Sequence, residues 1–471
     1  MKYVSTRGGI DPVSFREAVL MGLARDGGLL LPESFPDVRD RLAAWSRLPY
    51  ADLAFEVVRL FADDLPADDL RAIVRRSYAS FRPVPPAPDQ AWTGPEPVPV
   101  RPAGPVHLME LYHGPTLAFK DVALQFLGNL FEYVLGDGGR ELNVVVATSG
   151  DTGSAAIHGL RGRKGIRIFV LHPAGRVSPV QEMQMTSVLD DNVFNIALGG
   201  TFDDAQRIVK TLFADLPFKD TRHLGAVNSI NWARVLAQVV YYFYGAFRTM
   251  ERTGAPEVSF AVPTGNFGDV FAGYVAWRMG LPVRRLHVAT NENDILARFF
   301  STGVYSLGEV VPTISPSMDI QVASNFERWL FLRAGGDAAR VRAWMDAFAR
   351  DRSLRLAPLP DGTQDPVLRA GRADTAATLA TIRRFHDEFG VLLDPHSAVG
   401  VSVALASGDP APLVCLCTAH PAKFPDAIAR ATGDASLATA PEVEALRGAP
   451  TRKFPLPADA KTVADFVAAR T

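Results

Sequence analysis

From residue 141 onward, short apolar runs rich in β-branched residues alternate with segments of helical spacing. The runs Asn143–Ala147, Ile166–Leu171 and Val258–Val262 are typical, and Asp269–Met279 is one of the helical segments between them. Strands that are apolar along their whole length need cover on both faces, and parallel sheets receive that cover from the helices of βαβ units. The alternation therefore predicts an α/β fold built on open, mostly parallel sheets.

A length of 471 residues is enough for two or three domains. Before the alternating part, Tyr50–Phe61 and Asp68–Ala79 have helical spacing, and the proline-rich stretch Phe81–Pro105 has none, which is typical of a linker or domain boundary. We predict four parts: a small, mainly helical N-terminal region at 1–95, a smaller α/β domain at 96–235, a larger α/β domain at 236–430, and a peripheral helical tail at 431–471.

Charge and hydropathy argue against several classes of partner. A net charge of −2 with 21% charged residues gives no basic footprint for nucleic acid, and no run of 18 apolar residues predicts a membrane span. The two cysteines, Cys415 and Cys417, are too far apart along one expected strand to bridge easily, and two thiols make no zinc site. We therefore expect no metal site, two buried thiols, and a soluble protein of the reducing cytoplasm.

The segment Tyr112–Leu127 carries a chemical signal of its own. A turn at His113–Pro115 leads to Phe119 and Lys120, and the apolar helical run Val122–Leu127 follows. The field at the start of a helix disfavours a positive charge, and partial burial acts in the same direction. Both effects would lower the pKa of Lys120, as a Schiff-base lysine requires. A solvated lysine beside an amphipathic helix is the alternative that this segment alone leaves open.

Two glycine-rich loops share one geometry. The sequences ATSGDTGSAA (147–156) and VPTGNFGDVFAG (262–273) each lead from an expected strand to the start of a helix. Backbone N–H groups at a helix N-terminus bind anions, although a single such loop can also use glycine for purely structural reasons. Neither loop has a dinucleotide or Walker signature, so NAD and ATP are not favoured. Together with the lysine, the loops indicate a cofactor that carries a phosphate and a substrate that carries a carboxylate.

Several motifs resemble those of threonine synthases. The segments HGPTLAFKD, ATSGDTGSAA, PTGNFGD and TAHPAKF are similar to the branch found in many bacteria and fungi, and YVSTRGG with GLARDGGLLLP resembles the N-terminal region of that branch. The resemblance covers nearly the whole chain in the right order. It implies fold type II, in which two α/β domains clamp pyridoxal 5'-phosphate (PLP), as in tryptophan synthase β-chains and serine dehydratases.

The resemblance also implies cofactor-binding residues. Lys120, which follows Phe119 at the cofactor, would hold PLP as a Schiff base and act as the catalytic base. Asp151 falls near the ring hydroxyl where related enzymes carry asparagine, so that either a proton is shared there or the side chain turns elsewhere. Thr418 would meet the pyridine nitrogen, with loop capping as its alternative role. The phosphate cup maps onto Gly265, Asn266, Phe267, Gly268 and Asp269. We expect the Asp269 side chain to cap the helix and point away from the phosphate.

The implied reaction converts O-phospho-L-homoserine and water into L-threonine and phosphate. The substrate carboxylate would bind to the loop Thr148–Thr152, with Ser149 and Thr152 as hydroxyl donors. A second anion site is needed for the substrate phosphate, and Arg234 is its main candidate, with an ion-paired helix arginine as the alternative. The other candidates for that site are Asn231, Ser178 and Gln181.

Some residues near these motifs receive no role. Residues of the segment SPSMDIQVASNFER are expected to border the active site, His396 is expected to be a hydrogen-bonded core residue, and His420 and Lys423 are candidates only for shaping their loop. The unassigned polar residues are Asp319, Asn325, Arg328, Asp394 and His396. A PLP-dependent serine or threonine dehydratase is the alternative function, and a non-catalytic ligand-binding relative is a third interpretation. Monomer and homodimer both remain open.

Overall fold

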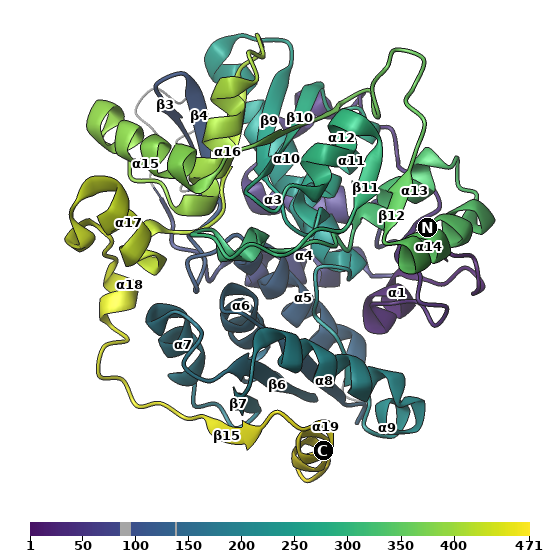
Figure 1. Ribbon diagram of the computed structural model, residues 1–471. Coiled ribbons are helices and arrows are strands. Elements are labelled where there is room, and N and C mark those ends of the chain that lie inside the picture. Colours follow the sequence, from purple (N-terminus) through teal and green to yellow (C-terminus); the bar gives the residue numbers. More distant parts are fainter. Residues whose placement is uncertain (85–95, 137–138) are drawn as a thin grey trace.

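The structure, a computed structural model, describes residues 1–84, 96–136 and 139–471. Its main bodies are a six-stranded and a five-stranded sheet with helices packed against them, and an N-terminal layer that consists mostly of helices (Figure 1). This arrangement confirms the predicted α/β class and the mostly parallel sheets. No helix in the described ranges is long and apolar enough to cross a membrane.

The larger sheet has the strand order β13-β10-β9-β14-β4-β3. All neighbouring strands in it are parallel except β3 and β4, which pair antiparallel at one edge. Every residue of the central strand β9 is buried, as expected for a strand covered on both faces. The strands are β3 (Val100–Ala103), β4 (Val106–Glu110), β9 (Val258–Pro263), β10 (Val283–Thr290), β13 (Leu368–Arg372) and β14 (Leu413–Cys417). The helices that follow or cover them are α10 (Trp232–Thr253), α11 (Gly268–Arg278), α12 (Ile295–Thr302), α15 (Thr375–Phe389), α16 (Pro395–Ala406) and α17 (Pro425–Thr432).

The smaller sheet has the order β15-β7-β6-β5-β8 and is parallel throughout. Its strands are β5 (Leu142–Ala147), β6 (Ile166–Pro173), β7 (Val193–Gly199), β8 (Leu224–Gly225) and β15 (Phe454–Pro457). Its helices are α6 (Asp151–Leu160), α7 (Pro179–Thr186), α8 (Phe202–Ala214), α9 (Leu216–Thr221) and α19 (Ala460–Ala468). Helix α5 (Lys120–Leu135) packs against α6 on one side and against α10 on the other, so it lies between the two sheets.

The N-terminal layer starts with the antiparallel pair β1 (Tyr3–Ser5) and β2 (Leu30–Pro32). Between these strands lies α1 (Phe15–Met21), which begins with the capping box that Ser14 and Glu17 predict. The other helices of the layer are α2 (Leu42–Trp45), α3 (Tyr50–Val58) and α4 (Ala67–Tyr78). The remaining elements are β11 (Val304–Ser306), β12 (Ser353–Arg355), α13 (Phe326–Arg333), α14 (Ala338–Asp351), α18 (Pro441–Glu444) and the short turns η1 (Pro316–Met318), η2 (Pro421–Lys423) and η3 (Ala435–Leu437).

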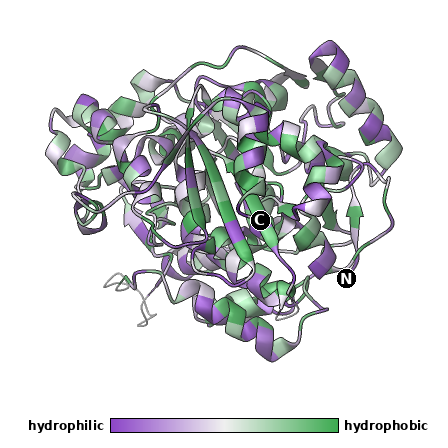
Figure 2. Ribbon diagram, turned by 90° about the horizontal axis from the view of Figure 1, so that it is seen from below, coloured by the Kyte–Doolittle hydropathy of each residue, from purple (hydrophilic) through white to green (hydrophobic). Residues whose placement is uncertain are grey.

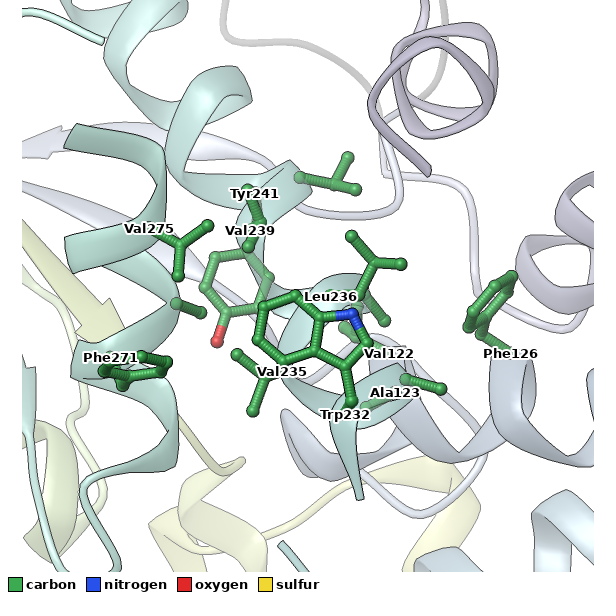
Figure 3. Packing of buried hydrophobic residues seen from close by; sticks show 14 of the residues in the cluster. Val122, Ala123, Phe126, Trp232, Val235, Leu236, Val239, Tyr241, Phe271 and Val275 are labelled. Carbon is green, nitrogen blue, oxygen red and sulfur yellow. The ribbon is translucent and has the colours of Figure 1, made fainter. Parts of the chain in front are cut away.

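The packing of α5, α10 and α11 forms the centre of the hydrophobic core. Trp232 and Leu236 of α10 lie between Val122 and Phe126 of α5 on one side and Phe271 of α11 on the other (Figure 3). Helix α10 is buried around almost its whole circumference, so it is an internal helix and not an amphipathic surface one. Figure 2 shows the strands largely in hydrophobic green and the outer helices with hydrophilic purple bands.

The predicted extent of the smaller domain does not match the structure. The predicted smaller domain, 96–235, contains β3 and β4, yet both strands belong to the larger sheet, where β4 pairs with β14. The predicted limit at 235 falls inside the continuous helix α10. Strand β3 also lies within the proline-rich stretch read as a linker; an edge strand tolerates Pro102 because one side of it needs no partner. The predicted limit at 95 lies outside the described residues.

The predicted tail at 431–471 is helical in part, but it also contains a strand and is not peripheral. Strand β15 pairs in parallel with β7 and extends the smaller sheet at its edge. Helix α19 buries Val463 and Val467 in the core of the same sheet, and Phe466 packs edge-on against Phe169 of β6. The alternate residues Phe454 and Leu456 of this strand are partly buried, as suits an edge strand that packs on one face.

Helices α5 and α6 cross at two glycines. A Cβ atom added at Gly128 of α5 would lie 2.0 Å from the backbone oxygen of Gly159, and one added at Gly159 of α6 would lie 2.5 Å from the backbone oxygen of Leu124. Only hydrogen side chains permit backbones to approach this closely. Since α5 begins with Lys120 and α6 with Asp151, this contact also fixes the separation of those two residues.

We predict that Gly128→Ala lowers the free energy of unfolding by about 1–3 kcal/mol, the usual cost of overpacking a core. Alanine is the better helix former, so a loss of stability would come from the crossing and not from helix propensity. Urea denaturation measures the change. Gly199→Ala is the matched control, because its added Cβ would meet only the Leu456 oxygen at 3.9 Å. Equal midpoints for the two variants would show that the crossing is not tight.

Candidate active site

The predicted functional segments meet at the carboxyl ends of parallel strands. Lys120 follows β4, the loop 148–150 follows β5, the loop 264–267 follows β9, and Thr418 follows β14. In open α/β sheets, ligands bind beyond the carboxyl ends of the strands, where the loops and the helix N-termini converge. The topology therefore brings together segments that are as much as 300 residues apart along the chain.

A tight turn positions Lys120 as the first residue of α5. Both the backbone N–H and the hydroxyl of Thr116 donate to the Asp121 carboxylate, each at 2.8 Å. Leu117 adopts a φ of 59°, an uncommon conformation for a branched side chain that the surrounding contacts have to hold. The Phe119 N–H donates to the backbone oxygen of Thr418 at 2.8 Å, which ties the turn to the loop after β14.

The amine of Lys120 is buried and lies close to one carboxylate. Its side chain is 11% exposed, and Nζ lies 3.5 Å from Oδ2 of Asp151 and 5.0 Å from the centroid of the Phe119 ring. Burial lowers the pKa of Lys120; Asp151 opposes this shift, and the positive charges of Lys423 and Arg234 add to it. The direction is the one that the sequence predicts, and burial is its main cause. An amine with a lowered pKa can act as a nucleophile and a base.

Asp151 turns toward Lys120 and accepts from several side chains. Its Oδ1 lies 2.7 Å from Nζ of Lys423 and accepts from Nε2 of Gln181 at 2.7 Å, and its Oδ2 accepts from Oγ of Ser317 at 3.3 Å. Burial disfavours the carboxylate, but the charges of Lys423 and Lys120 outweigh burial and lower the pKa of Asp151 below its usual range. The side chain therefore does not turn elsewhere, and a neighbouring lysine offsets its charge.

The loop before α6 is ordered by Thr148 and leaves two hydroxyls free. Oγ1 of Thr148 accepts from the N–H groups of Gly150 and Gly153, at 3.0 and 2.8 Å. Ser149 is exposed and Thr152 is half-buried, and neither side chain has a hydrogen-bond partner among the described residues. Both hydroxyls are thus available to an anion, as the sequence predicts for a substrate carboxylate.

The loop after β9 packs closely against Ser317, and its backbone N–H groups are available to a ligand. A Cβ at Gly265 would lie 2.9 Å from the Ser317 oxygen. Phe267 has a φ of 62° and is held by ring contacts with Phe300 and Phe326, at 6.2 and 5.6 Å between centroids. In the described part of the chain, the N–H groups of residues 265–268 form no hydrogen bond. Because α11 begins at Gly268, these donors lie at a positive helix end.

The prediction that Asp269 caps the helix is wrong. Its Oδ1 accepts from the hydroxyls of Tyr241 and Tyr242 on α10, at 2.5 and 2.8 Å, and not from the backbone of its own first turn. Burial raises the pKa of Asp269 to about 6, although both tyrosines lower it. Two long side chains on a neighbouring helix therefore satisfy this carboxylate, where the sequence pattern indicated only a local cap.

Arg234 is a buried guanidinium that has no acidic partner among the described residues. Its Nη1 donates to the Val227 oxygen at 2.9 Å, its Nε has no hydrogen-bond partner, and it forms no ion pair within the described residues. Burial lowers its pKa to about 10, so the group stays charged at neutral pH. A buried, unpaired cation is costly unless an anion occupies the site. The alternative of an ion-paired helix arginine does not hold for this residue.

Three residues predicted to bind substrate serve the protein itself. Ser178 caps α7, and its Oγ accepts from the N–H of Gln181 at 3.3 Å. Asn231 caps α10 through Oδ1 and donates through Nδ2 to the Val19 oxygen, so both ends of its amide are used. The side chain of Gln181 contacts Asp151 and lies so close to Gly150 that a Cβ there would be 2.2 Å away. Short polar residues before a helix are commonly caps, and this role accounts for Ser178 and Asn231 without a substrate.

The residues without predicted roles form the support of the site. Asn325 donates to the Asn266 oxygen through N and Nδ2, at 3.0 and 3.2 Å. Arg328 is fully buried and donates to the oxygens of Leu30 and Ile230 and to the side chain of Asn325. It therefore connects the N-terminal layer to the loop after β9. Asp319 orders its own loop through Thr313, Asn291 and Asn293.

Thr418 and His420 lie in the loop after β14, and His396 lies near the start of α16. The Thr418 N–H donates to Ser397, and its hydroxyl has no partner in the described ranges, so no capping bond occupies it. His420 caps η2 and burial lowers its pKa to about 4. His396 accepts from the Ser317 N–H through Nε2 at 3.2 Å and faces Asp394 through Nδ1 at 2.9 Å, as expected for a hydrogen-bonded core residue.

Sequence reasoning missed two residues of the site, Ser317 and the buried Lys423. Ser317 lies in a segment expected to border the site, but no pattern singled it out within that segment.

A separate pocket of about 410 Å³, bordered by Arg284, Arg285 and Arg369, includes none of the site residues. The pocket therefore does not mark this site.

The donor set fits PLP. A buried amine of lowered pKa suits an aldehyde, four free N–H groups at a helix end suit a phosphate, and the free Thr418 hydroxyl suits a ring nitrogen. These are features of the chain itself, and each of them comes from a different strand end.

Comparisons with known proteins support the same cofactor. Family models match residues 2–78 (Threonine synthase N terminus), 98–360 (Pyridoxal-phosphate dependent enzyme) and 397–467 (Threonine synthase, C-terminal). The threonine synthase of Methylobacillus glycogenes is 46% identical over 99% of both chains, and that of Corynebacterium glutamicum is 44% identical over 99% of this chain and 98% of its own.

Among solved structures, a PLP-bound threonine synthase from Brucella melitensis superposes with a TM-score of 0.92 and 45% identity, covering 100% of this chain and 99% of that one. These matches confirm the resemblance, the fold type and the cofactor that the motifs predict. The chain therefore belongs to the threonine synthase family of pyridoxal-phosphate-dependent enzymes.

Proposed function

We propose that this chain converts O-phospho-L-homoserine and water into L-threonine and phosphate. The observation that carries the proposal is a buried amine accompanied by three separate sets of unpaired anion donors. These are the N–H groups of residues 265–268, the hydroxyls of Ser149 and Thr152, and the guanidinium of Arg234. The reaction brings three anionic groups to the site: the cofactor phosphate, the substrate carboxylate and the substrate phosphate.

The cofactor would be held by residues from several strand ends. Lys120 would bind its aldehyde, the loop 265–268 its phosphate, and Thr418 its ring nitrogen, with Phe119 and Asp151 beside the ring. When bound, PLP supplies an electron sink that stabilises negative charge at the substrate α-carbon. The neutral Thr418 hydroxyl does not favour a proton on the ring nitrogen, whereas a carboxylate would.

Lys120 is the proposed base. Burial lowers the pKa of its amine, which is the direction that proton abstraction requires, and the amine would accept the substrate α-proton at Nζ. The same amine is positioned to return protons as phosphate leaves and water adds. Ser149 and Thr152 would hold the carboxylate in place during these transfers, and Arg234 would stabilise the leaving phosphate.

A serine or threonine dehydratase is the alternative within the same fold. Its substrates carry no phosphate, so a buried cation without a carboxylate partner would have nothing to bind in such an enzyme. Arg234 therefore favours the phosphorylated substrate. A non-catalytic relative is disfavoured because Lys120 and both anion-binding loops are retained.

We further propose a cytoplasmic enzyme that acts as a monomer or a homodimer. The cytoplasmic location is supported by Cys415 and Cys417, two buried thiols on one strand that do not pair with each other. Light scattering of the purified 51.0 kDa chain distinguishes one copy from two.

The substrate assignment predicts a clear division of activities. With O-phospho-L-homoserine the purified enzyme should release phosphate and form threonine, at a kcat/KM at least about 10-fold above that for any release of ammonia from serine or threonine, because one buried charged contact contributes about 1.5–3 kcal/mol. Malachite-green and coupled ammonia assays measure the two products. Faster ammonia release would replace the proposal with the dehydratase.

Lys120→Ala should reduce turnover by about 10²-fold to 10⁴-fold, the usual contribution of a general base. PLP should still bind, but without the visible absorbance of its covalent link to the protein. Lys164→Ala, at an exposed lysine, is the control and should leave both activity and absorbance unchanged. Substantial activity in Lys120→Ala would refute the role of the amine.

Arg234→Ala should raise KM for O-phospho-L-homoserine about 10-fold to 100-fold, because a buried charged contact to phosphate is lost. The control is Arg161→Ala, which removes an exposed arginine paired with Asp190 at 2.7 Å. The amount of PLP bound is followed by absorbance in both variants. If Arg234→Ala instead loses PLP, the arginine belongs to the cofactor site or the fold.

A further inference from the structure

Lys423 is a lysine with no solvent exposure and no role in the proposed reaction. It ends the short turn η2, in the loop that follows β14 of the larger sheet. Lysine is almost never fully buried unless it is paired. The partners that make this burial possible therefore indicate what the residue does.

The ammonium of Lys423 has two partners from different parts of the chain. Its Nζ lies 2.7 Å from Oδ1 of Asp151, at the start of α6, and donates to the Thr116 oxygen at 2.9 Å, in the turn that delivers Lys120. One side chain thus connects the loops of both sheets to the turn before α5. The contact with Asp151 is the shorter of the two and is an ion pair. The hydrogen bond to the Thr116 oxygen fixes the orientation of the ammonium group.

Asp151 is consequently shared between two lysines. Oδ1 faces Lys423 at 2.7 Å and Oδ2 faces Lys120 at 3.5 Å, and both lysines are buried. The shorter distance means that Lys423 takes the larger part of the carboxylate's charge. A single negative charge that is already paired attracts a proton on Lys120 less strongly than a free one does.

The other charged groups around Lys120 do not compensate for Asp151. Arg234 adds a positive charge from α10, and His396 acts electrostatically on Asp151 in the same direction as the two lysines. Asp121 is the neighbouring residue on α5, but its carboxylate accepts from Thr116 and burial raises its pKa to about 6. The charge of Lys120 therefore depends on how strongly Asp151 is paired with Lys423.

We propose that Lys423 is a positioning residue that shares Asp151 with Lys120, so that the Lys120 nitrogen gives up its proton more readily than it would beside an unshared carboxylate. This inference rests on the proposed cofactor role of Lys120 and not on the identity of the substrate. It also explains how a carboxylate can stand near the ring hydroxyl of the cofactor, because Lys423 already offsets its charge.

The test is a pH titration of the holoenzyme by visible absorbance, which reports whether the nitrogen of Lys120 carries a proton. Lys423→Met removes the charge at similar volume, and Lys423→Gln also keeps a donor for Thr116 if the methionine variant folds poorly. Both variants should raise the pH midpoint of the titration by about one pH unit or more, which is the usual effect of a nearby charge on a pKa. Lys423→Arg should restore the midpoint because the charge returns.

Lys453→Met is the matched control, since it removes a half-exposed lysine paired with Glu182 at 2.6 Å, away from Lys120. A midpoint in the methionine and glutamine variants equal to that of the control would overturn the inference, and a lower melting temperature alone would then mark Lys423 as structural. The titration needs no substrate. A failure to release phosphate from O-phospho-L-homoserine would therefore refute the proposed reaction without affecting this result.

Discussion

The shared carboxylate of Asp151 is the interaction on which the site depends. It lies between Lys120 and Lys423 and accepts from Gln181 and Ser317, so groups from both sheets converge on one residue. Burying these charges is costly unless every partner is in place, and removing one leaves the others uncompensated. The close crossing of α5 and α6 supports the same site, because it sets the distance between the Lys120 amine and the Asp151 carboxylate.

Much of the fold could be predicted from the sequence. Buried parallel strands such as β9 and β14 are continuous apolar runs, and the capping box at Ser14 has a local signature, so both follow from neighbouring residues. The domain limits and the role of β15 could not be predicted in this way. Strand β4 joins β14 across about 300 residues, and β15 joins β7 across about 250, and no local pattern encodes such pairings.

The candidate site shows the same division. Lys120 and the two glycine loops were recognisable because their chemistry depends on adjacent residues. Whether Ser178 binds a ligand or caps α7 depends on where α7 begins and how it lies relative to the site. The tyrosine partners of Asp269 come from another helix. Lys423 looked like a loop residue because its partners are Thr116 and Asp151, each more than 250 residues away.

The edge position of β15 has a consequence for how the chain matures. The smaller sheet is otherwise complete at β8, which ends at Gly225, yet its outer strand and the buried face of α19 come from the last residues of the sequence. During synthesis on the ribosome, β7 remains an open edge until residues 454–457 have emerged, and such edges promote association between nascent chains. The smaller sheet therefore completes its folding late, and a chain that stops before residue 454 would keep an aggregation-prone edge at β7.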